Sequence, residues 1–90
     1  MELKEIQQRN YKANVSRGQI SEHSTVSDFI YKLAEETGEF IKAEDEEQAA
    51  GELADMALVI TAIAEHHGID LMVEMQKKMC INEYRAYVGQ

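Results

Sequence analysis

Two pairs of acidic residues carry the strongest chemical signal in the sequence. Glu36 and Glu39 are three positions apart, and so are Glu52 and Asp55. Residues at this spacing share a face of a helix, so each pair would present two carboxylates side by side. If the two helices faced each other, the four acids would repel and raise one another's pKa. A divalent cation would compensate them, and all-oxygen ligation favours Mg²⁺, or alternatively Mn²⁺.

A solvated helix face is the alternative interpretation, and for either pair alone it would be preferred. The acids at residues 44–47 are expected to be solvated in a turn. Two pairs beside the apolar stripes of adjacent helices nevertheless favour a metal site. A di-iron bundle would need a Glu three positions before a His on two helices. None of His23, His66 and His67 has such a Glu, so that kind of site is excluded.

Helical periodicity and end signals define the elements that must position these acids. The pattern predicts four helices: about residues 2–15, from Thr25 to the acidic run at 44–47, 47–67, and 70–87. Thr25 and Asp28 are spaced to cap the second helix as a reciprocal pair. A hairpin between the second and third helices would bring the two acidic pairs together.

The third helix is apolar on almost every side. Ten of the twelve residues from Leu53 to Ala64 are apolar, and they cover nearly the whole helix circumference. Such a helix must be covered on more than one side, so we expect a homodimer with this helix near the interface. Gly68 is expected to end this helix and Asp70 to cap the next. The fourth helix is expected to face inward with the following residues: Leu71, Met75, Met79, and Ile81 or Cys80.

Composition limits the remaining possibilities. The chain has 90 residues, enough for a single domain, 1–90. Seventeen acidic against nine basic residues give a net charge of −8, which argues against binding nucleic acid through its phosphates. Cys80 is the one cysteine and cannot form an internal disulfide. No signal peptide or membrane-length apolar segment is visible, so we expect a cytoplasmic protein without a membrane partner.

The acidic motifs are similar to those of a known family. The segment Lys32-Leu-Ala-Glu-Glu-Thr-Gly-Glu39, followed by Glu52-Leu-Ala-Asp55, resembles the EExxE…ExxD signature of the MazG-like all-α nucleoside triphosphate pyrophosphohydrolases. The turn at 68–71 also suits that family. Lys78, Asn82 and Arg85 resemble its final basic motif. The resemblance covers residues 26–87, and the first 24 residues match only vaguely.

The resemblance implies an all-α, four-helix MazG-like fold whose bundle is completed by homodimerisation, as a dimer or a dimer of dimers with shared active sites. It implies cleavage of a nucleoside triphosphate between the α and β phosphates, giving a monophosphate and pyrophosphate. It assigns Mg²⁺ binding to the following acids: Glu36, Glu39, Glu52 and Asp55. Glu35 matches the first Glu of the motif, so Glu35 and Glu39 are the expected catalytic residues, with Glu35 as a helper base or a support behind the ligands.

A nucleotide carries about four negative charges, so a chain of net charge −8 needs local cations to hold it. The nucleotide-binding candidates are Lys32, Lys78, Asn82 and Arg85. The last three share a helix face at spacings of four and three. The alternatives are ordinary: Lys32 pairs with Glu36, and Arg85 lies at a frayed helix end.

Two other functions remain open at this point. Phosphoribosyl-ATP pyrophosphohydrolase shares the architecture and the chemistry, but nothing in the sequence marks its substrate, so a general nucleoside triphosphate is preferred. A non-catalytic dimerisation or regulatory module is the other possibility. The four acidic residues at the motif positions speak against a module that has lost its activity.

Overall fold

Four α-helices account for most of the computed structural model, which describes residues 1–89. In chain order they are α1 (Leu3–Ser16), α2 (Val26–Ile41), α3 (Glu46–His66) and α4 (Leu71–Tyr87). No strand occurs in this described range, so the predicted all-α class is confirmed. The predicted order of helices and their approximate limits are also confirmed.

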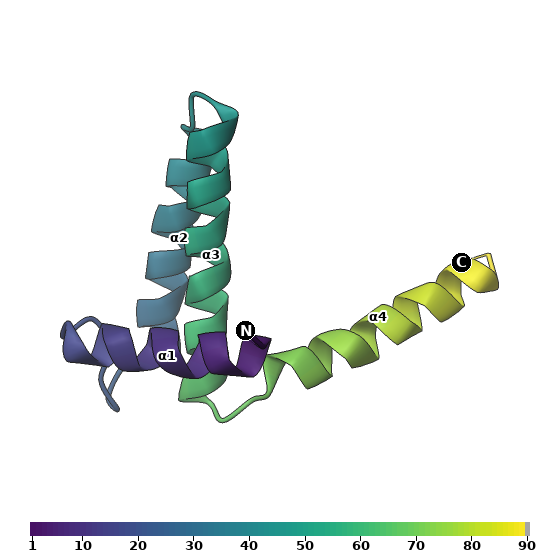
Figure 1. Ribbon diagram of the computed structural model, residues 1–90, viewed down its shortest axis with the longest axis horizontal. Helices are drawn as coiled ribbons and strands as arrows, with labels where there is room; N and C mark the ends of the chain where they lie inside the picture. Colours follow the sequence, from purple (N-terminus) through teal and green to yellow (C-terminus); the bar gives the residue numbers. More distant parts are fainter. Residues whose placement is uncertain (90) are drawn as a thin grey trace.

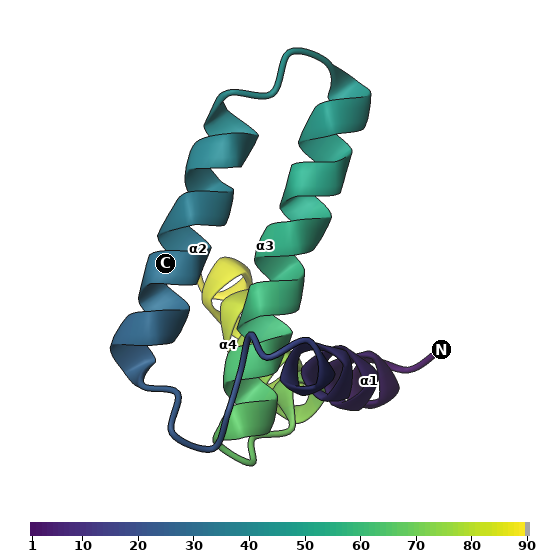
Figure 2. The same cartoon turned by 90° about the vertical axis from the view of Figure 1, so that its left-hand side faces the viewer.

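Helices α2 and α3 form an antiparallel hairpin (Figure 2). The predicted cap of α2 is present, because the Thr25 hydroxyl accepts from the Asp28 N–H and the Asp28 carboxylate accepts from the Thr25 N–H. Helix α3 begins at Glu46, one residue before its predicted start. The Asp45 carboxylate accepts from the Gln48 N–H at 2.8 Å and starts the helix there.

The structure corrects one local expectation at this hairpin. Glu46 and Glu47 were expected in a turn, but they lie in the first turn of α3. Negative side chains are favourable there, because the helix dipole places partial positive charge on the exposed N–H groups. The repulsion within the acidic run is therefore offset by the helix end, and the connection between α2 and α3 lies at residues 42–45.

Helix α1 crosses the open end of the hairpin (Figure 1). Asn10 donates from Nδ2 to the Leu58 carbonyl of α3 at 2.9 Å. Gln7 is almost fully buried, and it donates to the Ile69 carbonyl at 2.6 Å and to Glu65 at 3.0 Å. These side chains tie α1 to the end of α3 and to the turn that follows it.

The small core lies where α1, α2 and α3 meet. Phe29 of α2 is buried and packs against the His66 ring of α3, with ring centroids 5.0 Å apart. The Tyr11 hydroxyl of α1 lies 2.8 Å from His66 Nδ1. His66 therefore joins all three helices. Val59, Ala62 and Ala64 complete the buried apolar set.

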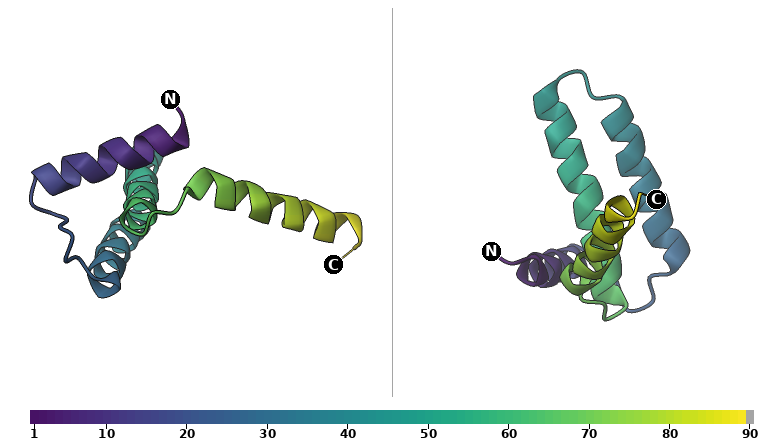
Figure 3. Two further views of the ribbon diagram at one scale, coloured as in Figure 1. Left: turned by 90° about the horizontal axis from the view of Figure 1, so that it is seen from below. Right: turned by 90° about the vertical axis from the view of Figure 1, so that its right-hand side faces the viewer.

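Helix α4 projects away from the other three helices (Figures 1 and 3). Gly68 ends α3 with a positive φ of 67°, as predicted, and Asp70 accepts from the Val73 N–H to begin α4. The two helix axes differ in direction by 110°. Met75 and Met79 are more than half exposed, and Cys80 and Ile81 are exposed as well. The prediction that these residues face inward is therefore wrong within the single chain.

Within residues 1–89 no single helix is both long and apolar enough to cross a membrane. The bent pair formed by α3 and α4 reaches that length and composition only when the two helices are taken together.

Candidate active site

Three carboxylates from the two hairpin helices converge near the middle of the hairpin. Glu36 comes from α2, and Glu52 and Asp55 come from α3. One oxygen of each lies within 4.8 Å of the others, which is close enough for all three to hold one cation. Glu36 and Glu52 are half-buried and Asp55 is exposed. The antiparallel pairing of α2 and α3 therefore brings together three of the four acids assigned to metal binding.

Glu52 shows the electrostatic cost of this convergence. Burial of its carboxyl group raises the pKa of Glu52 above the ordinary glutamate value. The negative charges of Asp55, Glu36 and Glu39, in decreasing order, raise that pKa further. Glu39 is exposed and lies outside the three-oxygen group, yet its charge is near enough to act on Glu52. Its role as a ligand stays a prediction.

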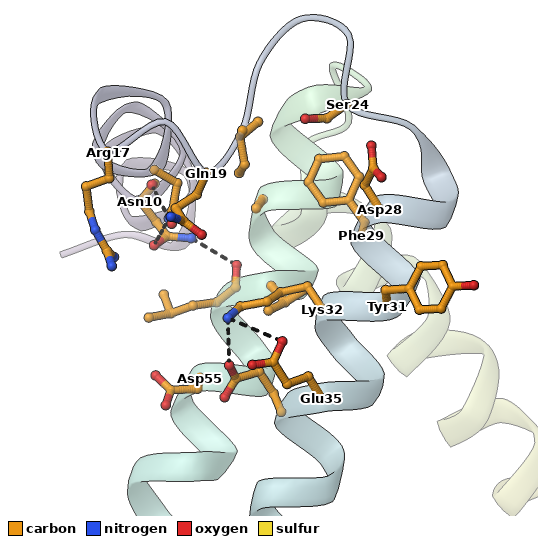
Figure 4. A pocket seen from close by; sticks show the side chains of 16 residues that line it. Asn10, Arg17, Gln19, Ser24, Asp28, Phe29, Tyr31, Lys32, Glu35 and Asp55 are labelled. Atoms are coloured by element: carbon orange, nitrogen blue, oxygen red, sulfur yellow. Dashed lines mark hydrogen bonds and ion pairs between the residues drawn. The ribbon is translucent and has the colours of Figure 1, made fainter.

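Lys32 reaches the carboxylates from one turn earlier on α2 (Figure 4). Its Nζ lies 3.1 Å from Glu36 Oε1 and 3.9 Å from Glu35 Oε2. The Glu36 side chain is 12% exposed and the Glu35 side chain is 64% exposed. Glu36 therefore faces α3, whereas Glu35 faces solvent beside it. The ion pair between Lys32 and Glu36, given above as the alternative to nucleotide binding, is present. It also places a cation at the edge of the acidic cluster.

A cleft of about 470 Å³ adjoins this cluster. That volume lies within the range of small-molecule sites, roughly 300–1,000 Å³. Glu35, Glu36, Asp55 and Lys32 line one end of it, and Figure 4 shows Ser24 at the opposite end. Most of the apolar lining comes from α2 and α3, and Ile20 adds to it from the connection after α1. The residues from the two helices are Phe29, Leu58, Val59 and Ala62. The cleft can therefore hold a charged group beside the acids and an apolar ring beyond them.

The amino-terminal part of the chain supplies cleft residues that the sequence patterns did not indicate. They come from α1 and the connection after it: Asn10, Asn14, Arg17 and Gln19. Asn14 donates from Nδ2 to the Asn10 carbonyl at 2.8 Å and to Asn10 Oδ1 at 3.1 Å. Two asparagines four positions apart inside a predicted helix could have indicated a functional role for α1, because asparagine is unfavourable in helix interiors.

The basic motif of α4 lies apart from the carboxylates. Lys78, Asn82 and Arg85 are exposed on the projecting helix, and none of these described residues lines the cleft. A single chain does not bring this motif to the acidic cluster. Its assignment to nucleotide binding stays a prediction that needs a second subunit.

The acidic hairpin and the adjoining cleft set the structural context for comparison with known proteins. Residues 4–77 match the profile of the family described as phosphoribosyl-ATP pyrophosphohydrolase. The chain belongs to this family. The matched range includes α1 except for its first residue and ends before Lys78. No curated protein and no solved structure matches the chain significantly.

Membership of the phosphoribosyl-ATP pyrophosphohydrolase family confirms two predictions. This family belongs to the MazG-like all-α nucleoside triphosphate pyrophosphohydrolases, so the resemblance drawn from the acidic motifs is confirmed. Its members are nucleotide pyrophosphohydrolases, which are hydrolases acting on acid anhydrides. The family description names phosphoribosyl-ATP, the alternative substrate considered from the sequence, and not the general nucleoside triphosphate that the acidic motifs favoured.

Proposed function

We propose that this protein hydrolyses phosphoribosyl-ATP between the α and β phosphates, giving phosphoribosyl-AMP and pyrophosphate, with Mg²⁺ as its cofactor. Family membership over residues 4–77 is the observation that carries the substrate. The acidic cluster beside a cleft of nucleotide size supports the metal and the reaction.

The residues present fit a hard divalent cation. Glu36, Glu52 and Asp55 offer only carboxylate oxygens, from two helices whose spacing the hairpin fixes. Oxygen donors without His or Cys favour Mg²⁺, with Mn²⁺ as an alternative, over zinc. Glu39 is the further ligand in this proposal. When bound, the cation supplies positive charge that neutralises and polarises the triphosphate.

The remaining side chains at this end of the cleft have separate roles in the proposal. Glu35 is exposed beside Glu36, so its carboxylate can accept the proton of the attacking water. Lys32 pairs with Glu36 and Glu35 and can transfer its contact to a phosphate oxygen when the substrate enters. The apolar lining from Phe29, Leu58 and Val59 offers a surface for the adenine ring.

A homodimer is part of the proposal because apolar surface remains open on the single chain. Leu53 and Ile60 of α3 are 56% and 42% exposed, and Met75 and Met79 of α4 are 53% and 55% exposed. A second copy would cover these side chains and remove them from water. Dimerisation would also allow the basic face of α4, which carries Lys78, Asn82 and Arg85, to approach the acidic cluster of the other subunit.

Unmodified nucleoside triphosphates are the second candidate substrates. The EExxE…ExxD motif in residues 35–55 is the observation that favours them, because the wider superfamily carries the same acidic signature. The two candidates share the bond that is cleaved and differ in the group attached to the base.

The experiment compares kcat/KM for phosphoribosyl-ATP with kcat/KM for a panel of ribo- and deoxyribonucleoside triphosphates in Mg²⁺. We expect phosphoribosyl-ATP to be preferred and EDTA to abolish turnover of every substrate. A higher kcat/KM for an unmodified triphosphate would move the assignment to the second candidate. No turnover of any of them would overturn the proposed activity.

A further inference from the structure

Arg17 is a cation in the cleft that the proposed mechanism does not use. It lines the cleft from the carboxyl end of α1, and within residues 1–89 it forms no ion pair. Figure 4 shows Arg17 on the α1 side of the cleft and Lys32 on the α2 side, with Asp55 below them. The two cations therefore stand on opposite walls above the acidic cluster.

The backbone around Arg17 is held in place by hydrogen bonds. The Arg17 N–H donates to the Ala13 carbonyl at 3.0 Å, and Gly18 then turns the chain with a φ of 74°. The N–H groups of Gln19 and Ile20 both donate back to the Asn14 carbonyl, at 2.9 and 3.3 Å. Residues 17–20 are thus folded against the end of α1.

Helix α1 itself is fixed across the hairpin. Asn10 donates to the Leu58 carbonyl, three positions after Asp55 on α3, and Gln7 is bonded to the turn before α4. The direction of α1 from Asn10 to Arg17 follows from these two attachments. The position of Arg17 relative to the acidic end of the cleft is therefore determined by packing between helices.

Cations on both walls of the cleft would favour the binding of a polyphosphate. The chain has a net charge of −8, and carboxylates line the end of the cleft where the phosphates would lie. Lys32 is already shared between two carboxylates of its own helix. Arg17 has no such partner, and its planar guanidinium can donate two parallel hydrogen bonds to one phosphate.

We propose that Arg17 binds the β and γ phosphates of the substrate and stabilises the leaving pyrophosphate. This inference rests on the proposed pyrophosphohydrolase activity. In the reaction, a water oxygen bonds to the α phosphorus while the bond from that phosphorus to the α–β bridging oxygen breaks. The bonding electron pair stays on the bridging oxygen, which departs with the pyrophosphate, and the proton of the water passes to a carboxylate and then to solvent. Arg17 lies where it can balance the charge that develops on the departing group.

The test compares Arg17→Gln and Arg17→Lys with the unaltered protein. Lys42→Gln is the matched control, because Lys42 is the exposed residue that ends α2 as Arg17 ends α1, and it does not line the cleft. We expect Arg17→Gln to lower kcat/KM about ten- to a hundredfold, the range typical of a lost charged hydrogen bond. Arg17→Lys should recover part of this loss, and Lys42→Gln should have little effect.

The phosphoribosyl arm of the substrate also ends in a phosphate, so a second measurement must show which phosphate Arg17 binds. Inhibition by pyrophosphate and by ribose 5-phosphate makes this distinction. We expect Arg17→Gln to raise the inhibition constant of pyrophosphate about tenfold or more, while that of ribose 5-phosphate stays unchanged. The opposite pattern, or an unchanged constant for pyrophosphate, would overturn the assignment.

If the unaltered protein turns over no nucleotide, the proposed function fails. Calorimetric binding of pyrophosphate in Mg²⁺ buffer would still test Arg17 by the same comparison.

Discussion

Glu36 is the single residue on which most of the site converges. Its side chain is 12% exposed, it pairs with Lys32 at 3.1 Å, and it shares the three-oxygen group with Glu52 and Asp55. It is the only member of that group contributed by α2. Removing its charge would leave Lys32 with only the longer contact to Glu35 and would deprive a bound cation of its half-buried ligand from α2.

We predict that Glu36→Gln abolishes metal-dependent activity while leaving the fold intact. Loss of a residue behind metal ligands typically costs ten- to a hundredfold in metal affinity, so loss of a ligand should cost at least about a hundredfold. Calorimetric titration with Mn²⁺ measures the affinity directly. Glu44→Gln is the control, because Glu44 is an exposed acid in the nearby connection and outside the cluster. Equal affinities for both variants would exclude Glu36 as a ligand.

Glu52 gives a prediction about pH. Its folded-state pKa is raised by burial and by the neighbouring acids, so the metal-free folded protein binds a proton more tightly than the unfolded chain. Stability from this group is therefore present at low pH and is lost as pH rises from the ordinary glutamate pKa through the raised one. Glu52→Gln should remove this dependence and raise the melting temperature in EDTA at neutral pH. An unchanged or lower melting temperature would contradict the raised pKa.

At the scale of elements, the hairpin could be predicted and the cleft could not. The limits of α2 and α3 follow from local signals, such as the Thr25–Asp28 cap and the apolar periodicity of each helix. The approach of Glu36 to Glu52 and Asp55 follows from pairing those two helices. The cleft depends on how α1 crosses the hairpin, and α1 carries only a weak apolar pattern. Arg17 could not be placed because it lies outside the four predicted helices, between about residue 15 and Thr25.

Gln7 is the residue that most directly tests this crossing. It is 2% exposed, donates to the Ile69 carbonyl at 2.6 Å, and accepts from the Leu71 N–H at 3.4 Å. Gln7→Leu would leave these backbone groups without their partner, which typically costs about 1–3 kcal/mol. Urea unfolding measures the loss, and Gln8→Leu, at an exposed neighbouring position, should cost much less. Equal losses would show that Gln7 does not anchor α1.

At the scale of the whole molecule, α4 is the element that the single chain leaves unexplained. Only Leu71 at its start is half-buried, and every later residue from Met72 to Tyr87 is exposed. The sequence predicted correctly that a helix begins after Asp70, because the capping signal is local. It could not show which surface covers the helix, because that depends on a partner in the proposed dimer.

We predict that the double substitution Met75→Glu with Met79→Glu converts a dimer into monomers. Two charges on the apolar face of α4 would have to be buried without partners in the dimer. Sedimentation velocity at several protein concentrations measures the assembly, and Gln76→Glu supplies an exposed control on the same helix. A monomeric unaltered protein, or a double variant that stays dimeric, would contradict an interface at this face.

Product analysis by ³¹P NMR tests the central claim most directly, with phosphoribosyl-ATP as substrate and Mg²⁺ or EDTA in the buffer. The proposal predicts equal amounts of pyrophosphate and phosphoribosyl-AMP in Mg²⁺, and unchanged substrate in EDTA. Release of orthophosphate would contradict cleavage between the α and β phosphates. Pyrophosphate formed at the same rate in EDTA would contradict the role assigned to the Glu36, Glu52 and Asp55 cluster.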